Sequence, residues 1–361
     1  MNGERRLSRG SFAAGRTVRR RRGGPRAFAC GLAALTVAAV AAGCAAAPAP
    51  APALAAVRPA AEVRPVVQAS TAAQDRTAAR ARAGGETAAA CKPQASSLAP
   101  LGPPVVTAGS EMARIRARGY LIAGVDQSTY HFGYLNPLDG QIEGFDIDMV
   151  RAVAQAIFGN PDKVEFKAIS DAQRIPAITS GSVDIVAHTM TITCARLASV
   201  DFSSVYFDAH QRVLVPDNSS AAGGLADLGG QKVCATQGSD SAATIENYPV
   251  RPKITAVQVP FWTDCLVLLQ QDEVAAVSTD DAILYGLQTQ DPFTKVVGPN
   301  LEDEPYGLAM SKQHPDLVRF VNAVVARDES DGGWEASYKH WVSPAGATPP
   351  TPQYAVSSPG G

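Results

Sequence analysis

The sequence predicts an α/β protein with two mostly parallel sheets and a ligand-binding cleft between them. Short runs rich in β-branched residues alternate with helical patterns from residue 120 to residue 290. The alternation occurs in two separate series, which indicates two sheets. The 361 residues, 46% of them hydrophobic, suffice for two domains with a core each. Open α/β sheets bind ligands at the carboxyl ends of their strands, so two facing sheets form a cleft.

Residues 1–43 are typical of a secretory signal. The basic run Arg19–Arg22 precedes an apolar run of 16 residues, Ala27–Ala42. That run is short for a membrane span, and a retained transmembrane helix is the alternative. The Ala-Ala-Gly-Cys sequence that ends at Cys44 resembles a bacterial lipobox, with Ala41 where that pattern prefers Leu. We expect Cys44 to be lipidated; the alternative is ordinary cleavage and an unanchored secreted protein.

The segments at the two ends of the body differ from it in composition. Residues 44–105 are rich in Ala, Pro and small polar residues, and residues 346–361 are rich in Pro and Gly. Such segments bury too little apolar surface to offset their conformational entropy. The sequence therefore predicts a disordered tether over 44–105 and a disordered tail over 346–361.

The first series of elements begins the folded body. Strands are expected at Tyr120–Val125, Val164–Ala168 and Asp184–Ala187. Asp148 is expected to cap a helix whose apolar residues follow the 3.6-residue period, while Asp146 braces the turn before it. A second helix, Ser170–Ser180, is expected to end at Gly181.

The second series repeats the pattern. Its expected strands are Lys232–Ala235, Ile254–Val259 and Ala275–Ser278, and its expected helices are Thr263–Gln270 and Asp281–Leu287. An amphipathic helix near the C-terminus follows, with apolar residues Leu317, Phe320, Val321, Val324 and Val325.

Four cysteines remain after the signal and the lipobox are removed, and they allow three pairings. Cys234 and Cys265 lie in adjacent strand and helix patterns, so we pair them; Cys91 and Cys194 would then join the tether to the body. Export makes disulfides the default interpretation. No metal site is predicted, because no two cysteines have CxxC spacing and the five histidines are scattered.

Charge and missing motifs exclude several functions. Residues 1–105 hold 15 of the 32 Lys and Arg but only 4 of the 34 Asp and Glu, which leaves a net charge of −13 for 106–361. Such an acidic body is unsuited to binding nucleic acid. The sequence has no GxSxG, SxxK, KTG or HExxH motif. We expect neither an enzyme nor a cofactor.

Three polar segments follow predicted strands and together suit a zwitterion. Residues 189–196 alternate hydroxyls with apolar side chains and end in Arg196, and residues 236–241 form a small-residue turn that opens a helix. Asp280 follows the last strand of the second series. A zwitterion needs a forked cation for its carboxylate, an anion for its ammonium, and hydroxyls between them. The sequence therefore predicts a binding site with two poles.

The chain resembles the family 3 extracellular solute-binding proteins, the polar amino-acid receptors of ABC importers, and most of all their actinobacterial glutamate- and glutamine-binding lipoproteins. The likeness spans Met112–Trp341. Its motifs are Gly144-Phe-Asp-Ile-Asp148, Arg174-Ile-Pro-Ala-Ile178, Gly181-Ser-Val-Asp184, Thr191-Ile-Thr193 with Arg196, Val200-Asp-Phe-Ser203, Val205-Tyr206, Gly229-Gly-Gln-Lys-Val233, Val277-Ser-Thr-Asp-Asp281 and Glu304-Pro-Tyr-Gly307.

The resemblance implies the two-lobe periplasmic-binding-protein fold, also called a Venus flytrap, in which lobe 1 is discontinuous around lobe 2. Lobe 1 is expected over 106–211 and 305–345, and lobe 2 over 212–304. The chain is expected to cross between the lobes near Arg212–Val215 and Pro305–Met310.

The resemblance also implies roles for individual residues. Arg196 would bind the ligand α-carboxylate, with Thr191 and Thr189 beside it, Asp280 would bind the α-ammonium, and Thr236 and Ser239 would close from lobe 2. Arg174 matches the position that reaches the side-chain carboxylate in glutamate and aspartate binders. Asp126 stands where acidic-amino-acid binders carry an arginine and glutamine binders an aspartate. Phe132, Tyr134 and Trp262 are expected as apolar walls, with core packing as the alternative for each.

The function implied is that of a monomeric receptor anchored to the outer face of the cell membrane. It would bind glutamate, glutamine, aspartate or asparagine and deliver the ligand to an ABC permease. One alternative partner is a membrane sensor of amino-acid supply. Another alternative is a dehydratase-like enzyme on the same fold with Asp126, Asp171 or Asp280 as base. A purely structural envelope lipoprotein is the third.

Overall fold

The computed structural model describes residues 91–342 and 349–355, which belong to one compact unit spanning Arg80–Gly361. The expected signal over 1–43, the lipidation residue Cys44 and the tether as far as residue 90 lie outside the described residues. Among the residues that are described, no helix combines the length and the apolarity that a bilayer span requires.

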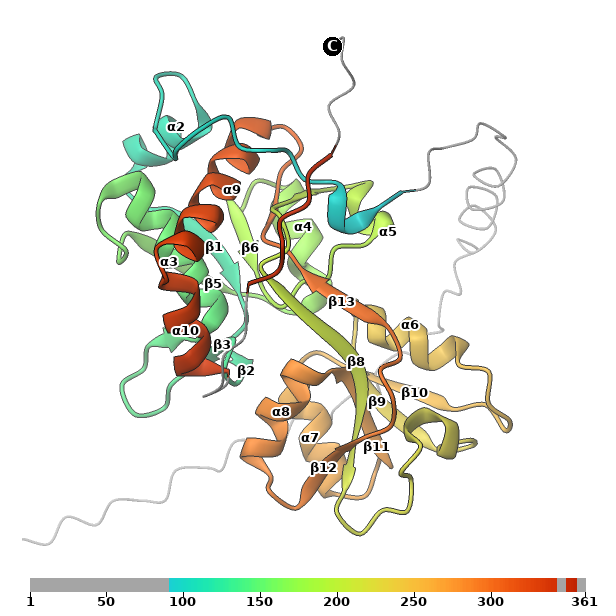
Figure 1. Cartoon of the computed structure of the whole chain (residues 1–361). Helices are drawn as coiled ribbons and strands as arrows, with labels where there is room; N and C mark the ends of the chain where they lie inside the picture. The colour runs from blue at the N-terminus through green and yellow to red at the C-terminus, as the bar shows by residue number, and fades with distance from the viewer. Residues whose placement is uncertain (1–90, 343–348, 356–361) are drawn as a thin grey trace, which may run out of the picture. The chain divides into compact units, whose positions relative to one another are not determined.

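Lobe 1 is built on a five-stranded sheet in the order β5-β1-β6-β14-β7 (Figure 1). Its strands are β1 (Leu121–Val125), β5 (Val164–Ala168), β6 (Ile185–Ala187), β7 (Asp201–Phe202) and β14 (Ala309–Met310). β1 is parallel to both β5 and β6, whereas β14 runs antiparallel to its neighbours. The three strands expected in the first series are thus confirmed to within one residue.

The helices of lobe 1 come from both ends of the folded region. They are α2 (Glu111–Arg118), α3 (Phe145–Phe158), α4 (Arg174–Thr179), α5 (Cys194–Leu197), α9 (Pro315–Ser330) and α10 (Gly333–Trp341), with the short 3-10 helices η1 (Pro93–Ala95) and η2 (Asp171–Gln173). A small sheet of β2 (Ser128–Thr129), β3 (Gly133–Leu135) and β4 (Ile142–Glu143) completes the lobe.

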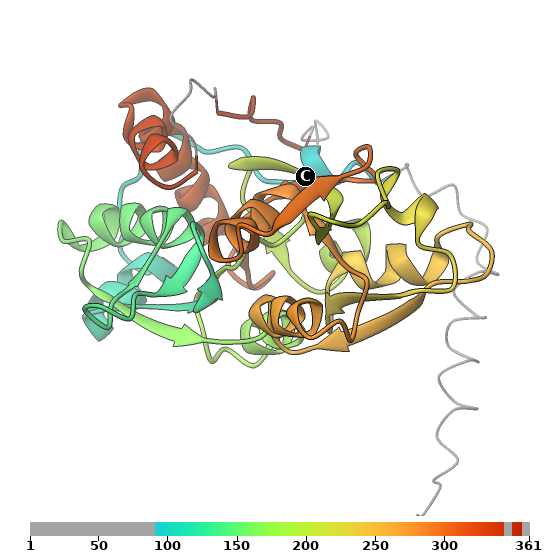
Figure 2. The ribbon, with the colours of Figure 1, turned by 90° about the horizontal axis from the view of Figure 1, so that it is seen from below.

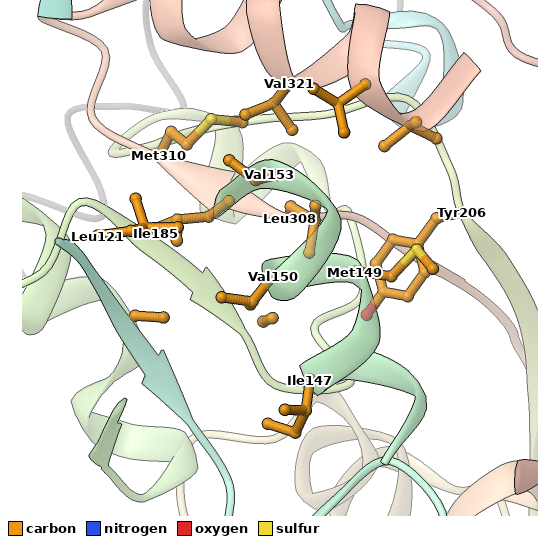
Figure 3. Packing of buried hydrophobic residues seen from close by; sticks show 14 of the residues in the cluster. Leu121, Ile147, Met149, Val150, Val153, Ile185, Tyr206, Leu308, Met310 and Val321 are labelled. Atoms are coloured by element: carbon orange, nitrogen blue, oxygen red, sulfur yellow. The ribbon is translucent and has the colours of Figure 1, made fainter. Parts of the chain in front are cut away.

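The core of lobe 1 forms where α3 packs on the sheet (Figure 3). Ile147, Val150 and Val153 recur at helical spacing on α3, and all three are fully buried. Strands β1 and β6 contribute Leu121 and Ile185 from the other side. The same cluster contains Leu308, Met310 and Val321, which follow lobe 2 in the chain. Lobe 1 is therefore discontinuous in sequence, as the resemblance implies.

Lobe 2 is built on a second sheet in the order β10-β9-β11-β8-β12. Its strands are β8 (Phe207–Pro216), β9 (Lys232–Thr236), β10 (Thr255–Val259), β11 (Ala276–Asp280) and β12 (Thr294–Val297). Its helices are η3 (Gly224–Asp227), α6 (Asp240–Asn247), α7 (Trp262–Gln270) and α8 (Asp281–Gln290). β9 is parallel to β10 and β11, whereas β8 and β12 are antiparallel to their partners. The expected elements of the second series are confirmed.

The long strand β8 connects the two lobes (Figures 1 and 2). Its first four residues, Phe207–His210, pair with β13 (Asp303–Tyr306), and the next four, Gln211–Leu214, pair with β11. The first crossing therefore lies before the expected Arg212–Val215. Polar residues occur at alternate positions of β8, so the sequence has no continuous apolar run there and this strand is not predicted. The crossing places Glu304 and Tyr306 of β13 between the two sheets.

Helix α3 begins earlier than expected. Gly144, not Asp148, is its N-cap residue, and its φ of +134° is one that L side chains rarely adopt. The Asp148 carboxylate instead accepts hydrogen bonds from Ser337 Oγ and Trp341 Nε1, each at 2.7 Å, and so joins α3 to α10. The expected helix over 170–180 is η2 followed by α4, and Gly181 ends it with a φ of +72°.

Two disulfides join Cys91 to Cys194 and Cys234 to Cys265, the pairs proposed from the sequence. The first disulfide holds the start of the described chain against lobe 1. Ser97 Oγ donates to the carbonyl of Phe202 at 2.7 Å and accepts from Asn322 Nδ2 at 2.7 Å.

The ends of the body extend further than expected in both directions. Ala355 N donates to the carbonyl of Ser97 at 2.8 Å. Residues 91–105 of the expected tether and residues 349–355 of the expected tail therefore belong to the described structure. Composition suggests disorder at both places, but the disulfide and the buried Asn322 supply partners that composition does not reveal.

Candidate ligand-binding site

A narrow cavity, with a volume of only about 10 Å³, lies where elements of the two lobes meet. Its walls are Asp171, Arg174, Thr189, Thr191, Arg196 and Glu304 on one side and Ser239, Asp240, Ser241, Trp262, Thr279, Asp280 and Ile283 of lobe 2 on the other. Seven of the ten ligand-binding residues expected from the sequence line it. They are Arg174, Thr189, Thr191, Arg196, Ser239, Trp262 and Asp280.

Arg196 forms the cationic pole of the cavity. It lies on α5, which Thr193 caps by accepting a hydrogen bond from the Arg196 backbone N–H. The guanidinium is buried, and its Nη1 donates to the carbonyl of Thr191 at 2.8 Å. Burial and the nearby Arg174 lower the pKa of Arg196 to about 10, so the group stays charged at neutral pH.

Arg174 adds a second buried guanidinium at the start of α4. Its Nη1 lies 2.9 Å from Asp171 Oδ1, and its Nε donates to the Asp171 carbonyl at 3.0 Å. Nη1 also donates to the carbonyl of His188 at 3.2 Å. Arg174 therefore already has a carboxylate partner within its own lobe, whereas the carboxylate nearest Arg196 comes from the other lobe.

Asp280 forms the anionic pole at the carboxyl end of β11. Its Oδ2 accepts a hydrogen bond from Tyr306 Oη at 2.6 Å. Burial raises the pKa of Asp280 well above its ordinary value, and the nearby Glu304 raises it further. Glu304, on β13, accepts a hydrogen bond from Thr191 Oγ1. This arrangement puts two buried carboxyl groups where a cation would relieve their repulsion.

The pKa of Glu304 predicts how stability depends on pH. Burial raises this pKa from 4.5 to about 7. Between these values the folded state holds a proton that the unfolded state has released, so stability falls as pH rises from about 4.5 to about 7. The contribution of Glu304 is on the order of 3 kcal/mol. Urea unfolding across this range measures it, and Glu304→Gln is expected to flatten the profile. Equal slopes for the two proteins would contradict the assignment.

Two uncharged polar groups of cavity-lining residues are buried without a hydrogen-bond partner. Among the described residues, neither Thr189 Oγ1 nor Trp262 Nε1 makes a hydrogen bond. Thr189 has a φ of +41°, and its backbone N–H donates to Asp146 Oδ2 at 2.7 Å. Asp146 thus orients Thr189 instead of bracing a local turn. Buried polar groups are normally paired, so both are available to a ligand.

Three hydrogen bonds join the lobes beside the cavity. Thr236 Oγ1 donates to Asp171 Oδ2, while Arg174 Nη2 and Arg196 Nη2 donate to the carbonyl of Gly238 at 3.2 Å and 3.3 Å. Gly238 is required there, because a Cβ would lie 2.8 Å from Ala172 Cα and the φ is +83°. Thr236 therefore connects the lobes without lining the cavity.

Two expected site residues are structural. Asp126 Oδ1 accepts hydrogen bonds from the backbone N–H groups of Gln127 and Ser128 at 2.6 Å and 2.9 Å, so Asp126 shapes a turn and does not line the cavity. Phe132 is fully buried in lobe 1, with its ring 5.0 Å from that of Phe207. For Phe132 the core-packing alternative is correct, whereas Trp262 lines the cavity.

Several cavity residues were not singled out as ligand-binding residues from the sequence. They are Asp171, Asp240, Ser241, Thr279, Ile283 and Glu304. Glu304 lies in one of the motifs of the resemblance, and Asp240 opens the predicted helix, so their positions carried a signal. The sequence gives no signal for the contacts of these residues, because each contact depends on how one lobe packs against the other.

A cation from one α/β lobe and an anion from the other, facing a shared cavity, define a two-lobe receptor for a small dipolar solute. The chain belongs to family 3 of the bacterial extracellular solute-binding proteins, whose family model matches residues 121–344. Proteins of this family are solute-binding receptors and not enzymes, which sets aside the dehydratase-like alternative.

Individual relatives support the same class. The chain is 36% identical to the ABC transporter glutamine-binding protein GlnH of Bacillus subtilis over 64% of this chain and 84% of that protein. It is 29% identical to the glutamate-binding protein GluB of Corynebacterium efficiens, over 60% and 76%. Among solved structures, an ancestral arginine-binding protein bound to glutamine is 33% identical, with a TM-score of 0.58 over 62% of this chain and 98% of that one.

Proposed function

We propose that the protein is a lipid-anchored extracytoplasmic receptor that binds glutamine and delivers it to an ABC permease. The observation that carries the proposal is that Arg196 of lobe 1 and Asp280 of lobe 2 line one and the same cavity. Glutamate, aspartate and asparagine are expected to be weaker ligands of the same site. Cys44 is the proposed point of attachment to the outer face of the membrane.

The two poles account for recognition of the amino-acid backbone. The Arg196 guanidinium offers paired N–H donors to the α-carboxylate. The carboxyl groups of Asp280 and Glu304 attract the α-ammonium, and the hydroxyls of Thr191 and Ser239 lie on the walls of the same cavity. A ligand that bridges the lobes in this way favours the closed form by its stronger binding to that form.

The charge of the cavity favours an uncharged side chain. Four carboxyl groups, those of Asp171, Asp240, Asp280 and Glu304, face two guanidinium groups. The raised pKa values of Asp280 and Glu304 show that negative charge is already disfavoured there, and a ligand with an additional carboxylate would disfavour it further. Arg174, which matches the side-chain position of acidic-amino-acid binders, is already paired with Asp171.

The unpartnered donor in the cavity favours a side chain that ends in an oxygen. Trp262 Nε1 only donates hydrogen bonds, so it requires an acceptor on the ligand. An amide has such an acceptor without a charge, whereas an ammonium or guanidinium side chain lacks one. The printed names of two relatives, both glutamine-binding proteins at 36% identity, agree with this choice.

A thermal-shift panel of the twenty amino acids tests the proposal. Glutamine is expected to give the largest rise in Tm, because binding to the folded state stabilises it by RT ln(1 + [L]/Kd). N-acetylglutamine is the matched control, since it keeps the amide but lacks the ammonium, and it is expected to give no shift. A panel in which no amino acid raises the Tm would overturn the proposal. A larger shift with glutamate than with glutamine would overturn the choice of ligand.

A further inference from the structure

We propose that Asp240 is an internal competitor for the ligand carboxylate and thereby sets the affinity of the site. Its carboxylate occupies Arg196, the group that a ligand carboxylate needs. The inference rests on the proposed function for the identity of the ligand, whereas the contact between the two residues is independent of it.

The competing contact joins the two lobes. Asp240 is the first residue of α6 in lobe 2, and its Oδ2 lies 2.6 Å from Arg196 Nη1 of lobe 1. The other partners of the Arg196 side chain are the backbone carbonyls of Thr191 and Gly238. Within the described part of the chain, Asp240 is the one carboxylate that forms an ion pair with this guanidinium.

The aspartate and the ligand present the same chemical group to Arg196. A guanidinium attracts a carboxylate whether it belongs to a side chain or to an amino acid. Asp240 Oδ2 pairs with Arg196 by charge and proximity, and among the described residues it accepts no hydrogen bond. Both cannot occupy Nη1 at 2.6 Å, so a bound ligand must displace Asp240 or share the fork with it. The net free energy that Arg196 contributes to binding is therefore the difference between its contact with the ligand carboxylate and its contact with Asp240.

Asp240 has a place to move to. Its side chain is 38% exposed, and it also lines a larger cavity of about 730 Å³, which Glu304 lines as well. Partial exposure makes the ion pair modest in strength, because water solvates the released carboxylate. Displacement is thus possible at a small but measurable cost in affinity.

The same contact holds the lobes together. It supplements the hydrogen bonds from Thr236 to Asp171 and from the two arginines to Gly238. Removing the Asp240 charge is therefore expected to have two effects: tighter ligand binding and a more open protein when no ligand is present. Either effect can be measured separately.

Calorimetry on Asp240→Asn tests the competition. The variant is expected to bind glutamine roughly 3- to 10-fold more tightly than the wild type. Glu302→Gln is the matched control, because Glu302 lines the same larger cavity and loses the same charge, yet forms no ion pair with Arg196. It is expected to bind within about twofold of the wild type. Unchanged or weaker binding by Asp240→Asn would overturn the proposal, as would an equal gain in Glu302→Gln.

A distance measurement between spin labels on the two lobes tests the contact without any ligand. Ligand-free Asp240→Asn, and Asp240→Ser as a second variant, are expected to show a larger share of long distances than the wild type or Glu302→Gln. Identical distributions in all four proteins would overturn the proposal. Because no amino acid is added, this result stands even where the proposed function fails the thermal-shift panel.

Discussion

Replacing Arg196 by alanine is expected to weaken glutamine binding by about 1.5–3 kcal/mol, or about 10- to 150-fold. The variant removes the forked donor to the α-carboxylate and leaves the carbonyl of Thr191 without its Nη1 partner. Isothermal titration calorimetry measures the loss. Arg196→Lys is the comparison, because it keeps the charge but not the paired N–H groups, and an intermediate affinity is expected.

The Arg196→Ala variant also tests the role of Asp240. When the guanidinium is absent, the Asp240 carboxylate and the ligand carboxylate no longer compete for it. Adding Asp240→Asn to Arg196→Ala is therefore expected to bring no further gain in affinity. Wild-type affinity in Arg196→Ala would show that the ligand carboxylate lies elsewhere.

Replacing Asp280 by asparagine is expected to weaken binding to a similar extent, about 10- to 150-fold. The substitution keeps the shape of the side chain and an oxygen that can accept the hydrogen bond from Tyr306 Oη. What it removes is the negative charge that the α-ammonium requires. Calorimetry with glutamine measures the loss, and circular dichroism checks that the fold is kept.

The neighbouring residue supplies the control for Asp280. Asp281 begins α8, its Oδ1 accepts hydrogen bonds from the backbone N–H groups of His210 and Ala282, and it is not among the residues that line the cavity. Asp281→Asn removes one negative charge at nearly the same place and is expected to bind glutamine as the wild type does. Equal losses in the two variants would mean that the general field of the lobe, and not the Asp280 carboxylate, holds the ammonium.

Most of the fold is predictable because its signals are local. Val164–Ala168 is recognised as a strand from β-branched and aromatic residues, and α3 from the spacing of Val150 and Val153. These patterns reflect burial against a single neighbouring layer. The start of α3 is not predictable in the same way, because a glycine with positive φ replaces the expected polar cap.

The strand that joins the lobes is missed for a different reason. β8 leaves one sheet and enters the other, so its burial changes along its length and includes the fully buried Gln211. Gln211 is polar but is satisfied by Ser278 Oγ at 2.9 Å. A buried polar residue with a partner distant in the sequence leaves no periodic signal.

The residues of the candidate site also fall into two groups, those that a local sequence pattern indicates and those that depend on contacts between the lobes. Arg196, Thr191 and Asp280 follow strand ends, where an α/β sheet places its ligand contacts, and the sequence therefore indicates them. Asp240 and Glu304 face the cavity only because β13 and α6 meet the other lobe. Asp126 also follows a strand, but the nearby backbone N–H groups bind its carboxylate first. A position at a strand end thus indicates a candidate residue but is neither required for lining the cavity nor sufficient for it.

A crystal structure of the protein grown with glutamine tests the central claim most directly. One glutamine is expected between the lobes, with its α-carboxylate on the guanidinium of Arg196 and its ammonium within hydrogen-bond distance of Asp280. Asp240 is expected to have turned toward the larger cavity. Density for glutamine outside this cavity, or a molecule oriented with its ammonium toward Arg196, would contradict the account.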